Sequence, residues 1–156
     1  MTKNNIFKTI IWILFIFYIS VILKLTVFRS GANIRVLNLI PFTMLAKIYK
    51  DNGLGYFYYL VLGNIGWFMP FGFMLPLIFK KMNTDKIILA AFLFSLFLEV
   101  SQYVLMVGYT ELDDVFLNTL GGLLGYICLI KRKVLLFGIP SFHKIHKLPH
   151  HASKKL

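Results

Sequence analysis

Acidic side chains in this sequence lie inside or directly beside long apolar runs. Glu99 falls within AAFLFSLFLEVSQYVLM, and Asp113 and Asp114 directly precede VFLNTLGGLLGY. A carboxylate facing lipid would cost ~2.5 kcal/mol or more, so these side chains are expected inside the protein. Two carboxylates in a partly dry site can divide general acid and general base work, which makes Glu99 and Asp114 the candidate catalytic pair. Capping of the N-terminus of the apolar run that follows them would also explain the two aspartates.

The composition is typical of a membrane protein. Of 156 residues, 58% are hydrophobic and 17% aromatic, well above the values of soluble domains. Seventeen Lys and Arg against six Asp and Glu give a formal net charge of +11, which in a soluble protein would suggest a nucleic-acid partner. Here the basic residues lie between apolar runs, so we expect contact with membrane lipids and no nucleic acid.

Four apolar runs approach the about 20 helical residues that span a bilayer. They cover residues 7–28, 54–79, 87–107 and 112–130, and in lipid only a helix satisfies its own backbone. Pro70 and Pro76 predict a kink or two half-helices in the second run. The sequence thus predicts an all-α polytopic membrane protein: a compact bundle of four transmembrane helices in a domain 1–140, followed by a basic tail, 141–156.

The distribution of basic residues predicts the orientation of this bundle. Twelve Lys and Arg lie on the side of the two termini and only five on the other. We therefore expect a multi-pass protein of the cell membrane with cytoplasmic N- and C-termini. The tail holds four histidines without acidic or cysteine neighbours, so it predicts an anionic-lipid contact, with no metal site and no cofactor.

This orientation brings polar residues of three spans into the outer leaflet. At 1.5 Å per residue, Asn64 lies near the midplane, and Glu99 and Gln102 lie in the outer half of their span. Asp114 and Asn118 fall in the first turns of the last span. We expect these polar faces to meet inside the bundle, because lipid cannot solvate them.

Structural roles would also explain several of these residues. Asn64 and Asn118 suit hydrogen bonds between helices, and Gly121-x-x-x-Gly125 is a pattern that lets a second helix approach closely. Glu99 suits a buried ion pair, for which the candidate partners are Lys24, Arg29 and Arg35. Pro41 excludes a continuous helix in the connection 29–53, which is expected to lie against the outer surface of the bundle, near the carboxylates.

The order of four motifs resembles the VanZ-like family of small bacterial membrane proteins. These motifs are NLIPF at 38–42, N-x-x-x-F-x-P-F-G at 64–72, E-x-x-Q at 99–102 and ELDDVFLNTLGGLLGY at 111–126. The resemblance spans roughly residues 37–126 and implies a role at the cell envelope. The namesake of the family is an accessory determinant of resistance to teicoplanin, and related proteins are linked to lipoglycopeptides.

Residues and resemblance together favour a non-enzymatic protein that binds an outer-leaflet ligand, either a lipid-linked cell-wall precursor or a lipoglycopeptide antibiotic. The candidate ligand-binding residues are Asn38, Pro41, Phe42, Asn64, Pro70, Phe71, Glu99, Gln102, Asp113, Asp114 and Asn118. Two alternatives stay open. One is an intramembrane hydrolase or transferase that uses the candidate catalytic pair, although no catalytic motif accompanies it. The other is a proton-coupled transporter or flippase, which with four spans would require a homo-oligomer.

Overall fold

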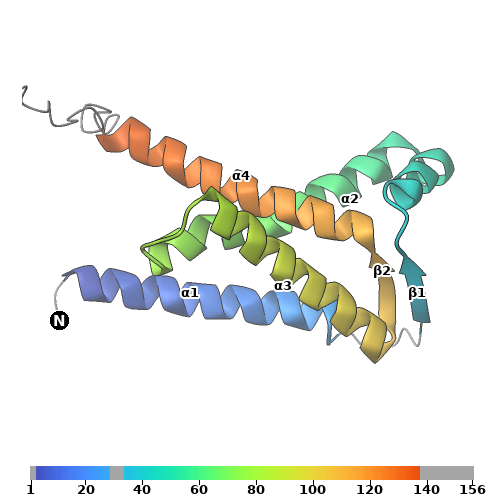
Figure 1. Ribbon diagram of the computed structural model, residues 1–156, viewed down its shortest axis with the longest axis horizontal. Coiled ribbons are helices and arrows are strands. Elements are labelled where there is room, and N and C mark those ends of the chain that lie inside the picture. Colours follow the sequence, from blue (N-terminus) through green and yellow to red (C-terminus); the bar gives the residue numbers. More distant parts are fainter. Residues whose placement is uncertain (1–2, 29–33, 138–156) are drawn as a thin grey trace, which may run out of the picture.

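The computed structural model describes residues 3–28 and 34–137 as four helices and a two-stranded sheet (Figure 1). In chain order the elements are α1 (Lys3–Thr26), β1 (Ile34–Asn38), α2 (Thr43–Ile78), α3 (Thr84–Leu105), β2 (Val107–Glu111) and α4 (Leu112–Phe137). Within these described ranges, four helices are long and apolar enough to cross a membrane. The predicted bundle of four membrane-spanning helices is confirmed, and the sheet is an addition to it.

The two ends of the molecule differ in character (Figure 1). Helix α1 begins and helix α4 ends at one end, whereas the sheet and the start of α2 lie at the other. If all four helices cross a membrane, the start of α1 and the end of α4 must lie on the same side of it. The cytoplasmic location of the termini stays a prediction, and Arg29 and the tail 141–156 with its histidines lie outside the described residues.

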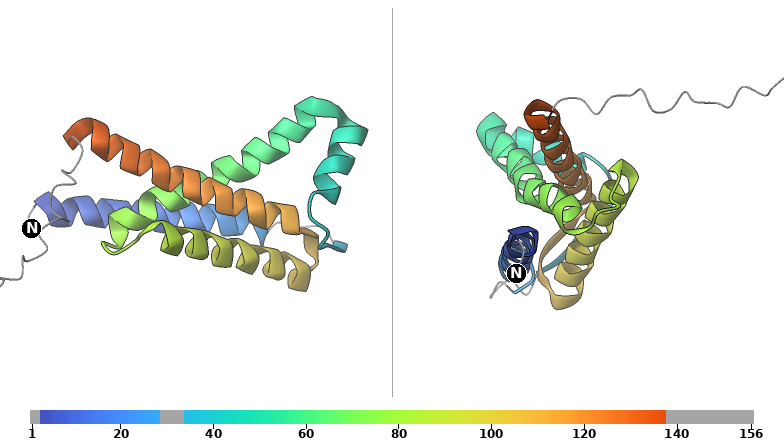
Figure 2. Two further views of the ribbon diagram at one scale, coloured as in Figure 1. Left: turned by 45° about the horizontal axis from the view of Figure 1, so that its top comes forward. Right: turned by 90° about the vertical axis from the view of Figure 1, so that its left-hand side faces the viewer.

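Helices α2 and α4 form the most extensive helix contact of the bundle, and they cross each other (Figure 2). Glycines on both helices bring the two backbones together. A Cβ added at Gly72 would overlap the carbonyl of Gly122, and one at Gly125 would overlap the carbonyl of Met69. A Cβ at Gly121 would likewise overlap the carbonyl of Ile65 in α2. The predicted packing role of Gly121-x-x-x-Gly125 is therefore confirmed.

Aromatic side chains fill the space that α1, α2 and α3 enclose. Phe71 is only 6% exposed, and its ring stacks on Phe94 with centroids 5.2 Å apart. The ring of Phe15 in α1 packs against the Phe71 ring, with centroids 5.9 Å apart. Because Phe71 is part of this core, its predicted role as a ligand contact is not supported by its position.

Helix α2 differs from the predicted second span in its start and in its interruption. It begins at Thr43 rather than at residue 54, and its backbone leaves the helical conformation only at Gly53, with φ 77°. Glycine adopts this left-handed conformation without a steric penalty. The backbone dihedral angles stay helical through Pro70 and Pro76, so the half-helices predicted there do not form. A short segment, 43–52, instead bends away from the main span (Figure 2).

The sheet links the first connection to the loop between α3 and α4. Strands β1 and β2 pair in parallel, with Ile34 opposite Val107 and Asn38 opposite Glu111. The connection therefore lies beside the acidic loop, as predicted. The pairing was not predicted, and it fixes the backbone of Glu111 directly before the acidic start of α4.

Candidate functional site

Asn38 organises the turn that leads from β1 into α2. Its Oδ1 accepts a hydrogen bond from the backbone N–H of Ile40 at 3.3 Å and another from the Thr43 hydroxyl at 3.2 Å. An asparagine that bonds to the backbone two residues on is a frequent turn-forming device. Asn38 thus shapes the NLIPF turn, and it lines neither of the two cavities described below.

Asp113 caps the start of α2, a helix to which it does not belong. Phe42 precedes that helix with φ 62° and provides no side-chain cap. The carboxylate of Asp113 is 2% exposed and accepts hydrogen bonds from the backbone N–H groups of Phe42 at 2.6 Å and Leu45 at 3.4 Å. Asp113 was considered as a cap of the fourth span, but its hydrogen bonds cap the start of α2 instead.

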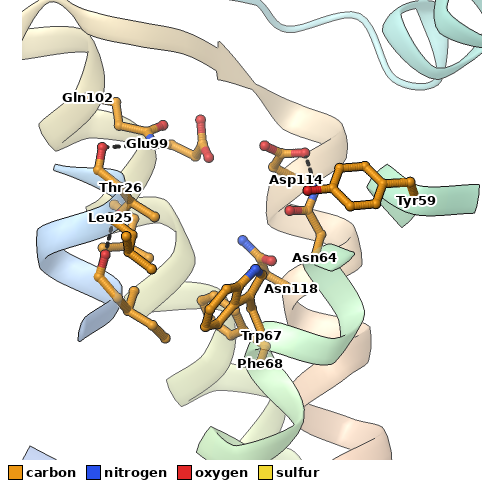
Figure 3. Close-up of a pocket in the computed structure, with 12 residues that line it drawn as sticks. Leu25, Thr26, Tyr59, Asn64, Trp67, Phe68, Glu99, Gln102, Asp114 and Asn118 are labelled. Atoms are coloured by element: carbon orange, nitrogen blue, oxygen red, sulfur yellow. Dashed lines mark hydrogen bonds between the residues drawn. The ribbon is translucent and has the colours of Figure 1, made fainter. Parts of the chain in front are cut away.

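Two adjoining cavities lie at this end of the bundle. The first, of about 410 Å³, is lined by Ile22, Leu25, Thr26, Tyr59, Asn64, Trp67, Phe68, Leu98, Glu99, Gln102, Asp114 and Asn118 (Figure 3). The second, of about 460 Å³, is lined by Met44, Leu45, Ile48, Asn52, Tyr56, Leu60, Asn64, Gln102, Tyr109, Glu111 and Asp114. Asn64, Gln102 and Asp114 line both cavities, which together form one cleft.

Polar side chains face each other across this cleft. Figure 3 shows Glu99 and Gln102 on one side and Asp114 with Asn64 on the other. The Asn64 amide donates to Asp114 Oδ1 at 2.5 Å, and the Asn118 amide donates to the Ser95 hydroxyl at 2.9 Å. Both asparagines therefore bridge helices, as their alternative role predicted, and they line the first cavity as well.

Glu99 and Gln102 are anchored at the α3 side of the cleft. Glu99 Oε2 accepts a hydrogen bond from the backbone N–H of Glu111 at 2.9 Å, which joins α3 to the end of β2. The Gln102 amide nitrogen donates to the carbonyl of Thr26 at 3.4 Å, which joins α3 to the end of α1. Hydrogen bonds to the backbone of neighbouring elements thus hold both side chains in position.

Two of the three basic residues considered as partners of Glu99, Arg35 and Lys24, lie within the described residues. The Arg35 guanidinium lies over the ring of Tyr103, 4.8 Å from its centroid, and its Nε donates to the Tyr103 carbonyl at 3.2 Å. Arg35 is thus engaged with Tyr103, near the C-terminal end of α3. Lys24 is exposed near the end of α1.

Comparison with known proteins places the chain in a family whose model covers all the residues of the cleft. The sequence matches the family described as VanZ/LLP1 over residues 9–137. The chain belongs to the VanZ/LLP1 family. A curated relative, Protein VanZ of Enterococcus faecium, is 29% identical over an aligned length of 116 residues, and the alignment covers 69% of this chain and 66% of that protein. The match thus spans slightly less than two thirds of the relative. No solved structure matches the chain.

Five predicted ligand-binding residues of this VanZ/LLP1 protein meet in the cleft, and six do not. The five are Asn64, Glu99, Gln102, Asp114 and Asn118. Asn38 and Asp113 hold the backbone, and Phe71 belongs to the core. Pro70 lines a separate apolar groove between α1, α2 and α4. Pro41 is exposed, and Phe42 stacks on Phe116 outside the cleft with centroids 6.3 Å apart.

The sequence prediction missed the part of the cleft that the start of α2 provides. Asn52, Tyr56, Leu60 and Asn64 recur every four residues and line the second cavity together. This spacing places Tyr56, Leu60 and Asn64 on one face of the main span, and Asn52 joins them from the segment that precedes the break at Gly53. Tyr56, Leu60 and Asn64 lie within the predicted span 54–79, whereas the place of Asn52 beside them depends on the bend of the chain at Gly53. Glu111 was noted as an acid but not included in the site, because nothing in the sequence indicated that β2 turns it toward the cleft.

Glu111 gives the protein a testable pH dependence. Burial, together with the negative charges of Asp114 and Asp113, raises the pKa of this carboxyl from its ordinary 4.5 to about 7. Between these values the folded protein binds a proton that the unfolded chain has lost, so the free energy of unfolding falls as pH rises. We expect a higher thermal unfolding midpoint at pH 5.5 than at pH 8, with the window set by the pKa of about 7.

The Glu111→Gln variant isolates this contribution, because glutamine stays neutral across the window. The thermal unfolding midpoint of this variant should change less between pH 5.5 and pH 8 than that of the wild type, because the variant lacks the group with a pKa of about 7. Asp51→Asn removes an exposed carboxylate outside the cleft and should keep the wild-type slope. An equal slope in wild type and Glu111→Gln would contradict the assignment.

Proposed function

We propose that this VanZ/LLP1-family protein supports resistance to teicoplanin-type glycopeptide or lipoglycopeptide antibiotics by binding an outer-leaflet ligand in the cleft. The ligand is a lipid-linked cell-wall precursor or the antibiotic itself. The observation that carries the proposal is the convergence of Asn64, Glu99, Gln102, Asp114 and Asn118, from three membrane-spanning helices, on one cavity. Intramembrane polar groups are costly, so their clustering indicates a site. The resemblance to VanZ-like proteins supplies the role in antibiotic resistance.

The cleft has the two kinds of wall that a lipid-linked ligand requires. Carboxylates and amides line its depth, while Leu25, Trp67 and Phe68 offer apolar and aromatic surface beside them. Trp67 and Leu25 are half exposed, at 51% and 52%, so this apolar surface faces the surrounding lipid. A polar head group would bind in the depth, and its chain would pass over the aromatic wall.

A second function, hydrolysis or transfer on a lipid-linked precursor, is favoured by one observation. Glu99 and Asp114 line the same cavity, so an acid and a base could act on one bound substrate. Both carboxylates accept a hydrogen bond from a protein donor, which equally suits two residues that position a ligand. Binding without turnover is therefore the primary proposal.

Antibiotic susceptibility of an expressing host tests the role of the cleft. We expect Glu99→Gln and Asp114→Asn each to reduce teicoplanin resistance to the level of cells that lack the protein. Both substitutions keep the size of the side chain and remove its charge, and loss of a charged hydrogen bond weakens binding about tenfold or more. Vancomycin is tested in parallel to learn whether the effect requires the lipid tail of the antibiotic.

Asp51→Asn is the matched control, because it removes a carboxylate that is exposed and lines neither cavity. It should retain full resistance at an equal level of protein in the membrane. Purified protein in nanodiscs should also bind teicoplanin or a lipid-linked precursor saturably. Full resistance in both cleft variants, or absence of saturable binding to both ligands, would refute the proposal.

A further inference from the structure

Gln102 presents an unused hydrogen-bond acceptor to the cleft. Its side chain is 9% exposed, and its buried Oε1 accepts no hydrogen bond from any described residue. The orientation of the amide is set by Thr26, whose carbonyl accepts from the nitrogen, because two carbonyl oxygens would repel each other in the flipped state. A buried acceptor without a donor costs about 1–3 kcal/mol, which a ligand with an N–H or O–H group would recover.

Carboxylates surround this acceptor. Glu99, Glu111 and Asp114 line the two cavities that Gln102 joins, and no lysine or arginine of the described residues lines either of them. Such a lining attracts a positive group and repels a phosphate or a carboxylate. The acidic residues in the described ranges do not group closely enough to hold a metal ion, so an organic cation fits the cleft better.

We propose that the cleft recognises a protonated primary amine carried at the head of a lipid-anchored ligand. An ammonium group has three N–H donors and no acceptor, which matches the Gln102 carbonyl and the carboxylates around it. The half-exposed apolar wall at Trp67 and Leu25 provides the path for the attached chain. This inference rests on the proposed function for the location of the ligand, and it adds the chemical class of the group that is bound.

Binding is tested with probes that share a twelve-carbon chain and differ only in the head: dodecylammonium, dodecanol and dodecanoate. The protein is placed in phosphatidylcholine nanodiscs, whose quaternary ammonium has no N–H donor. The sequence contains two tryptophans, so a Trp12→Phe background leaves Trp67 of the cleft as the reporter. At neutral pH we expect saturable changes in Trp67 fluorescence with dodecylammonium at a concentration about tenfold or more below that for dodecanol, and none with dodecanoate.

Variants link the response to the proposed contacts. Gln102→Leu removes the acceptor and should weaken dodecylammonium binding about tenfold. In its protonated form, Gln102→Glu keeps an O–H donor for the Thr26 carbonyl and a carbonyl acceptor for the ligand, so it should bind like the wild type. Asp114→Asn should weaken binding, and Asp51→Asn should leave it unchanged. Because Gln102→Glu alters the same position, its retained binding would show that the loss in Gln102→Leu is not a folding defect.

Several outcomes would overturn the inference. Equal binding of dodecanol or dodecanoate would exclude recognition of an amine, and unchanged binding in Gln102→Leu would exclude the proposed acceptor. Equal affinity for soluble butylammonium would exclude the lipid-anchored source. If teicoplanin or a lipid-linked precursor binds while dodecylammonium does not, only this inference fails. If no ligand and no probe binds, the proposed function fails with it.

Discussion

The Gly72→Ala variant is expected to lose the packing of α2 against α4 and to yield little folded protein. The added Cβ would overlap the carbonyl of Gly122; it is fixed rigidly to the backbone of one helix, and the carbonyl belongs to the backbone of the other. A flexible side chain could move aside, but a helix backbone can relax only by separating from its partner. Overpacking commonly costs 1–3 kcal/mol, and we expect about 3 kcal/mol or more here. Gly125→Ala should behave in the same way, since its Cβ would meet the carbonyl of Met69.

Gly66→Ala and Gly63→Ala are the matched controls on the same helix. A Cβ at either position would meet no atom within 4 Å, and alanine favours a helix by about 1 kcal/mol over glycine. These variants should therefore retain or slightly raise the thermal unfolding midpoint in detergent, while Gly72→Ala and Gly125→Ala lower it or aggregate during size-exclusion chromatography. A midpoint for Gly72→Ala equal to that of Gly66→Ala would contradict close packing of the two backbones.

The membrane spans and the depth of the polar residues could be predicted because lipid imposes simple rules. A span must be apolar, helical and about 20 residues long, so the position of a residue along its span gives its depth. This reasoning placed Asn64, Glu99, Gln102, Asp114 and Asn118 in one leaflet, and all five line the first cavity. The glycine pattern of α4 was predictable for the same reason, since close helix contact in lipid requires small residues.

The start of α2 and the sheet could not be predicted, because they depend on contacts between distant segments. Residues 43–53 end in Asp-Asn-Gly, a combination typical of loops, and no side chain near the first turn provides a cap. The cap comes from Asp113, 71 residues away from Phe42 in the sequence. Strands of five residues each likewise give too weak a pattern to reveal a partner.

Contacts between distant segments also explain why two residues, one in the NLIPF turn and one in the acidic loop, were wrongly predicted to bind a ligand. Asn38 and Asp113 are polar residues near the site, and sequence position alone cannot distinguish a side chain that bonds to backbone from one that lines a cavity. Glu111 shows the opposite error. It was omitted from the predicted site, yet β2 holds it beside Asp114 at the second cavity. The position of a carboxylate along the chain gives its depth but not its direction.

Asp113→Ala is expected to release the segment 43–52 while leaving the four membrane-spanning helices in place. Asp113 is 2% exposed, and both of its oxygens accept hydrogen bonds from backbone groups at the start of α2. A hydrogen bond to a charged group contributes about 1.5–3 kcal/mol, so loss of both should destabilise the segment locally by about 3 kcal/mol. Because Met44, Leu45 and Ile48 line the second cavity, its release should also weaken ligand binding in the cleft.

Amide hydrogen exchange measures this effect directly. A local loss of about 3 kcal/mol corresponds to exchange about a hundredfold faster in residues 43–48, with little change in α3 and the main part of α4. Asp85→Ala is the control, because Asp85 is an exposed carboxylate in the first turn of α3, where the helix N-terminus is capped by Asn83. Its loss should cost only about 0.3–1 kcal/mol. If exchange in 43–48 is as slow in Asp113→Ala as in Asp85→Ala, the two hydrogen bonds of Asp113 do not hold this segment, and its lining of the cleft must depend on other contacts.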